Sequence, residues 1–112
     1  MNIQIFGKNK CFDTKKAERY FKERRIHYQL IDLPRYGMSK REYAAVKASV
    51  GSMEGLIDKN SRAYDELYMA YLRPAEAEEK LMEHPELFQT PMVRNGSKAT
   101  VGYRPDVWTT WE

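Results

Sequence analysis

The chain contains one cysteine, Cys11, and the residues around it favour a reactive thiol. Cys11 follows a short β-prone segment, residues 2–6, and precedes a segment whose apolar residues recur at helical spacing. A thiol at the start of a helix lies near unpaired backbone N–H groups and the positive end of the helix dipole, which both favour the thiolate. Nearby lysines add positive charge: Lys8, Lys10, Lys15 and Lys16. We therefore expect Cys11 to be a nucleophile, although a lone cysteine also suits a small buried apolar position.

The remaining polar residues offer little other chemistry. One cysteine cannot form an intramolecular disulfide or a Cys-x-x-Cys metal site, and His27 and His84 lie far apart in the sequence without helix-spaced partners. We expect no metal site, no tightly bound cofactor and a reducing, cytoplasmic setting. Thr14 lies three residues after the cysteine. Its hydroxyl could donate a hydrogen bond to the sulfur, or it could simply cap the helix.

The first third of the chain predicts a β-α-β unit. Apolar spacing indicates a helix over residues 14–25, with Asp13 as its N-cap. Residues 26–33 are typical of a second strand, which Pro34 ends. We expect the two strands to be parallel and joined by a right-handed crossover.

The middle third predicts helices only. Ser39 with Glu42 three residues later forms a capping box, and the helix that follows ends at Gly51. Ser61 can cap another helix, and a further helix runs from Ala75 to about residue 83. We expect these helices to form an insertion over about residues 39–84.

The last third returns to strand. Residues 91–94 and 98–102 flank Asn95-Gly96, the strongest short hairpin signal, and a terminal helix begins near Pro105. The order β-α-β, helices, β-β, α predicts a thioredoxin-like α/β fold. We expect residues 1–112 to form a single domain: a mixed four-stranded sheet with the helical insertion between its βαβ and ββα halves.

Composition limits the classes of partner. The chain has 112 residues, 42% of them hydrophobic and 31% charged, with a net charge of +3. No apolar run reaches the length of a membrane span, and no signal-peptide pattern opens the chain. The basic residues of segment 8–25 fit the solvated side of an amphipathic helix better than a nucleic-acid face, because the excess positive charge is small and no aromatic–basic stacking motif accompanies it.

The aromatic residues are expected to serve packing. The eight tyrosines are interpreted as core-facing helix residues, where an aromatic ring with a polar tip suits half-burial. Trp108 and Trp111 are expected to pack over the edge of the sheet.

Four motifs give the chain a family resemblance. Residues 11–17 (CFDTKKA), 56–60 (LIDKN), 90–93 (TPMV) and 101–103 (VGY) resemble the ArsC/Spx/YffB-like family of glutaredoxin-related proteins. The resemblance covers nearly the whole chain and implies a thioredoxin-fold core with a helical insertion. It also implies a cis peptide bond before Pro91 beside the thiol, with the backbone of Thr90 pairing with a peptide-like substrate.

Departures from the family motifs narrow the expected chemistry. Spx-type regulators carry a second cysteine at the position of Thr14, so a two-thiol switch within this motif is impossible here. Arsenate reductases of the family hold the oxyanion with three arginines, which correspond here to Asp58, Thr90 and Arg104. A carboxylate in place of an arginine opposes oxyanion binding, and Arg94 is a possible substitute. We do not expect true arsenate reduction.

The resulting prediction is a single-cysteine thiol–disulfide oxidoreductase with glutathione or another small thiol as the resolving co-substrate, and a small-thiol or protein disulfide as substrate. Cys11 is the predicted nucleophile. The residues expected to stabilise the thiolate or to bind substrate are Asn9, Lys10, Thr14, Thr90, Pro91, Arg94 and Arg104. The rival hypothesis is a non-catalytic, Spx-like transcriptional adaptor that binds the C-terminal domain of the RNA polymerase α subunit. A family member that has lost its catalytic role is a third possibility.

Overall fold

The fold is built on a mixed four-stranded sheet. The computed structural model describes residues 1–112, and the strands follow the order β2-β1-β3-β4. The strands are β1 (Ile3–Gly7), β2 (Tyr28–Asp32), β3 (Met92–Asn95) and β4 (Lys98–Val101). β1 runs parallel to β2 and antiparallel to β3, and β4 runs antiparallel to β3. This topology confirms the predicted thioredoxin-like sheet.

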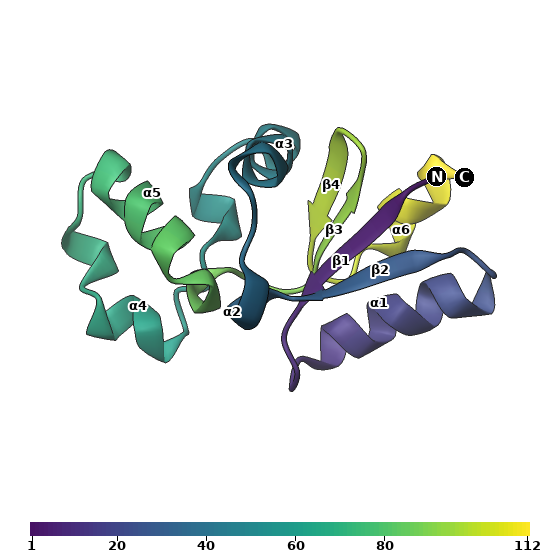
Figure 1. Cartoon of the computed structure of the whole chain (residues 1–112), viewed down its shortest axis with the longest axis horizontal. Helices are drawn as coiled ribbons and strands as arrows, with labels where there is room; N and C mark the ends of the chain where they lie inside the picture. The colour runs from purple at the N-terminus through teal and green to yellow at the C-terminus, as the bar shows by residue number, and fades with distance from the viewer.

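The chain has six α-helices and four short 3-10 helices besides the sheet. The α-helices are α1 (Phe12–Glu23), α2 (Leu33–Tyr36), α3 (Lys40–Val50), α4 (Arg62–Glu66), α5 (Pro74–Glu83) and α6 (Pro105–Trp108). The 3-10 helices are η1 (Glu54–Leu56), η2 (Met69–Tyr71), η3 (Pro85–Leu87) and η4 (Thr109–Trp111). α1 and α3 lie on opposite sides of the sheet, and α4 and α5 extend beyond its end (Figure 1). The molecule is therefore elongated, with extents of 43 × 26 × 23 Å.

Local signals predicted the ends of α3 correctly and the β3–β4 turn to within one residue. Ser39 and Glu42 form both hydrogen bonds of the capping box at the start of α3. Gly51 ends α3 with a φ of 102°, in the left-handed region that glycine adopts readily. At the β3–β4 hairpin, Asn95 is the last residue of β3 and pairs with Lys98, so the turn residues are Gly96 and Ser97, one position later than predicted.

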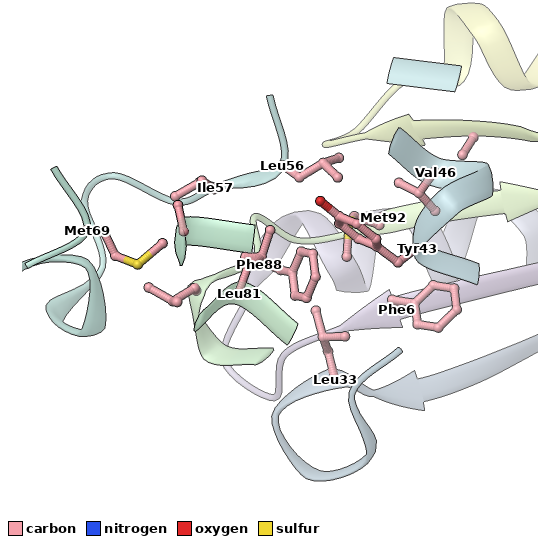
Figure 2. Close-up of a cluster of buried hydrophobic side chains, with 13 residues drawn as sticks. Phe6, Leu33, Tyr43, Val46, Leu56, Ile57, Met69, Leu81, Phe88 and Met92 are labelled. Atoms are coloured by element: carbon pink, nitrogen blue, oxygen red, sulfur yellow. The ribbon is translucent and has the colours of Figure 1, made fainter. Parts of the chain in front are cut away.

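The alternation of side chains along β1 divides the core in two. Ile3 and Ile5 pack with α1 on one face, in a cluster that also contains Trp108. Phe6 packs on the other face with residues of α3, in the larger cluster of 13 buried residues that continues into α5 (Figure 2). Burial on both faces fixes the register of β1 and hence the position of the loop that follows it.

Trp108 lies inside the smaller cluster, beside the edge strand β4. Its side chain is fully buried, and its Nε1–H donates to Thr100 Oγ1 at 2.8 Å. This hydrogen bond satisfies the indole N–H, so the whole ring can be buried.

None of the helices is both long enough and apolar enough to cross a lipid bilayer.

Candidate functional site

Cys11 is the N-cap residue of α1, so the helix begins two residues earlier than the sequence predicted. Asp13 lies in the first turn and is not the N-cap. The Cys11 N–H donates to the Lys8 carbonyl at 3.2 Å, and the Cys11 carbonyl accepts from the Lys15 N–H at 3.3 Å. The Cys11 side chain forms no capping hydrogen bond. The sulfur is therefore free to act at the positive end of a 12-residue helix.

The surroundings of the thiol lower its pKa. Partial burial of Cys11 alone would raise the pKa, but hydrogen bonds from the Thr14 and Thr90 side chains and from the Thr14 and Asp13 backbone outweigh that effect. The Thr14 hydroxyl oxygen is buried and has no partner while Cys11 is a neutral thiol, which leaves its O–H available to the thiolate. The net effect favours the thiolate at lower pH than for a free cysteine.

The loop before β3 lies against the thiol. The Thr90–Pro91 peptide bond is cis, as the family resemblance implied. The thiol donates to the Thr90 carbonyl at 3.5 Å, a contact that favours the neutral form because a thiolate has no proton to donate. The Pro91 carbonyl accepts from the Gly102 N–H at 2.8 Å, and this hydrogen bond holds the loop before β3 against the end of β4.

Cys11 borders an open pocket of about 350 Å³. Its lining residues are Lys8, Lys10, Cys11, Asp58, Gln89 and Thr90. Lys8 is half-buried, and its Nζ donates to the Glu86 carbonyl at 2.9 Å. Burial lowers the pKa of Lys8, while Asp58, Cys11 and Glu86 act in the opposite direction. The pocket thus combines a cysteine sulfur with two lysines and one carboxylate.

Asn9 and Thr14 face a different space from Lys10. Both line a second pocket of about 260 Å³ between the start of α1 and the β2–α2 segment, which Lys8 also borders. Thr14 packs tightly against Gly7, where an added Cβ would lie only 2.3 Å from Thr14 Cγ2. Gly7 therefore allows the first turn of α1 to approach β1 closely and sets the position of the Thr14 hydroxyl.

The structure does not place Arg94 or Arg104 among the residues that line the Cys11 pocket. Arg94 pairs with Gln4 across β1 and β3, and its guanidinium donates to the Gln4 side chain at 2.6 Å. Gln4 in turn donates to Glu42, which places this network on the α3 side of the sheet. Arg104 is exposed and forms an ion pair of 3.1 Å with Asp106.

Two lining residues were missed by the sequence reasoning as site residues: Lys8 and Gln89. Asp58 also lines the pocket, although the family motifs marked it only as a departure from the reductase arginines. A short antiparallel bridge between Ile57 and Phe88 brings the segments that carry Asp58 and Gln89 together. This pairing joins distant segments of the helical region, so no local sequence signal could reveal it. No group of three or more His, Cys, Asp or Glu side chains is placed to hold a metal ion.

Known proteins resemble the chain over most of its length. The global transcriptional regulator Spx 2 of Oceanobacillus iheyensis is 27% identical over 109 residues, which cover 95% of this chain and 80% of that protein. An ArsC-family-related protein from Bacteroides fragilis has a TM-score of 0.84 at 19% identity, over 100% of both chains. An arsenate reductase from Vibrio cholerae has a TM-score of 0.83 at 21% identity, over 99% of this chain and 97% of the other.

Because the two solved structures are only 19% and 21% identical to this chain, their similarity supports the fold alone. The family follows from a broader match. The model of the ArsC family matches residues 6–111, which include Cys11, the cis proline and every residue that lines the Cys11 pocket. The chain belongs to the ArsC family.

Proposed function

We propose that this protein is a single-cysteine thiol–disulfide oxidoreductase. The observation that carries the proposal is the position of Cys11: a half-exposed thiol at the N-cap of α1, beside an open pocket, with a lowered pKa. Reactive cysteines require this combination of access and thiolate stabilisation.

The proposed reaction is an exchange in two steps. The Cys11 thiolate attacks one sulfur of a disulfide, forms a new S–S bond with it, and the other sulfur leaves as a thiolate with the electron pair of the broken bond. A small-thiol thiolate such as glutathione then attacks the substrate sulfur of this mixed disulfide and releases the Cys11 thiolate. The chain has no second cysteine, so the resolving thiol must come from another molecule. A reducing cytoplasm would supply it.

The test is formation of a mixed disulfide on Cys11. The reduced protein is mixed with glutathione disulfide, and the adduct is measured by intact mass and by rate against pH. We expect adduct formation faster than with free cysteine at neutral pH, and none in Cys11→Ser, which has no thiol. A Cys11 pKa at or above about 8.5, the value of a free cysteine, would refute the proposal.

Arsenate reduction is not part of the proposed function. Asp58 borders the Cys11 pocket, where a carboxylate repels an oxyanion, and Arg104 is paired with Asp106. We expect no arsenite production with glutathione and glutaredoxin supplied. Turnover of roughly 1 per second or more, the ordinary enzymatic range, would contradict this expectation.

The similarity to a transcriptional regulator favours a second candidate function. In this alternative the protein is a non-catalytic adaptor that binds the C-terminal domain of the RNA polymerase α subunit. Binding of the purified domain, measured by calorimetry with the wild type and with Cys11→Ser, separates the two functions. Equal binding by both proteins, without disulfide exchange by the wild type, would favour the adaptor.

A further inference from the structure

The charges in the Cys11 pocket balance when the thiol is ionised. Lys8 and Lys10 contribute two positive charges, and Asp58 and the Cys11 thiolate contribute two negative ones. Such a pocket offers no net attraction to a dianion or a dication. It offers separate positive and negative partners to a substrate that carries both signs.

Asp58 has carboxylate capacity that the protein does not use. Its Oδ1 accepts from the Asn60 N–H at 3.0 Å, while no protein donor contacts Oδ2. None of the ion pairs in the structure includes Asp58, Lys8 or Lys10. The carboxylate therefore borders the pocket with one oxygen available to a ligand.

The backbone holds Asp58 firmly at the wall of the pocket. The Asp58 N–H donates to the Leu87 carbonyl at 2.8 Å, and the Gln89 N–H donates to the Leu56 carbonyl at 2.8 Å. The Gln89 side chain adds a bond to the Ile57 carbonyl at 3.1 Å. A ligand group that meets Asp58 thus meets a preorganised partner, at little further cost in ordering.

We propose that Asp58 is a specificity-determining residue that binds the ammonium group of the substrate, so that the site takes disulfides of amino-acid-type thiols. In such a substrate an ammonium and a carboxylate lie close to the sulfur. The ammonium meets Asp58, the carboxylate meets Lys10, and the sulfur between them faces Cys11. This inference rests on the proposed function, because it assigns the substrate class of the same exchange reaction.

The experiment measures the rate of mixed-disulfide formation with four probe disulfides. The probes are cystine, the dication cystamine, the dianion dithiodiglycolate and the neutral 2-hydroxyethyl disulfide, which serves as the reference. Asp58→Asn keeps an oxygen that can accept from the Asn60 N–H, so the local turn is retained. Asp65→Asn, an exposed residue of α4 outside the pocket, is the matched control.

We expect Asp58→Asn to lower the cystine rate relative to the neutral reference by about fivefold, which corresponds to an ion pair of about 1 kcal/mol. The dithiodiglycolate rate should rise in the same variant, whereas Asp65→Asn should change no ratio. A merely structural role of Asp58 would move all four rates in the same direction. Unchanged ratios, with the wild type still reacting with the neutral probe, would overturn the role of Asp58 and leave the proposed function standing. Failure of the wild type to react with the neutral probe would overturn both.

Discussion

Removal of the Thr14 hydroxyl should raise the pKa of Cys11 without destabilising the protein. The Thr14 side chain is 4% exposed, and its oxygen has no partner while the thiol is neutral. Thr14→Val replaces the hydroxyl by a methyl group of similar size, so the packing against Gly7 is retained. The change therefore removes one hydrogen bond to the thiolate and little else.

The size of the effect follows from that one bond. A hydrogen bond to a charged group contributes about 1.5–3 kcal/mol, and about 1.4 kcal/mol corresponds to one pKa unit. Cys11 is half-exposed, so water screens the interaction and we expect the lower end, a rise of about one unit. The folded thiol form should be as stable as the wild type or more stable, because a buried hydroxyl without a partner is itself unfavourable.

The assay is the rate of iodoacetamide alkylation against pH, together with thiolate absorbance. The chain has one cysteine, so both signals report Cys11 alone. Thr14→Ser is the matched control: it keeps the hydroxyl and so the low pKa, but it loses the methyl group that packs on Gly7 and with it about 0.8 kcal/mol of stability. A Thr14→Val protein whose Cys11 titrates like that of the wild type would refute the role of the hydroxyl.

Three further predictions concern stability. Gly7→Ala should lower the free energy of unfolding by about 1–3 kcal/mol in urea denaturation, because the new Cβ would overlap Thr14. A smaller loss would contradict the tight packing of α1 on β1 at this point. Thr100→Val should cost about 1–3 kcal/mol, because it leaves the buried Trp108 N–H without an acceptor, whereas Thr100→Ser should restore most of this. The folded-state pKa of Cys11 is lowered, so its contribution to stability should be fully present above the unfolded value of about 8.5 and lost as the pH falls through the folded value. The stability difference between the wild type and Cys11→Ser should accordingly grow with rising pH, and a constant difference would contradict the lowered pKa.

The elements with strong local signals were predictable from sequence. The capping box of Ser39 and Glu42 depends on side chains three residues apart, and the Asn95-Gly96 hairpin depends on two adjacent residues. The start of α1 was mispredicted for the same local reason. Asp13 is a favourable N-cap type, but the helix begins after Cys11, whose side chain caps nothing.

The features that depend on long-range pairing were not predictable. The strand that contains Arg94 was expected, but its side chain faces α3 because of the register between β1 and β3. The prediction that the tyrosines face the core is wrong for three of them. Tyr36, Tyr68 and Tyr71 are 67%, 69% and 86% exposed, since they lie in or beside helices too short for apolar spacing to indicate a buried face.

The pocket draws its walls from separate segments of the chain. The nucleophile and both lysines come from the loop between β1 and α1, whereas Asp58 comes from the helical region between β2 and β3. If Asp58 has the proposed role, substitutions in segment 56–60 would change the choice of substrate without altering the loop and helix start that hold Cys11. On the proposed function, an exchange of that short segment between relatives is the smallest graft expected to transfer a substrate preference while Cys11 and its loop stay the same.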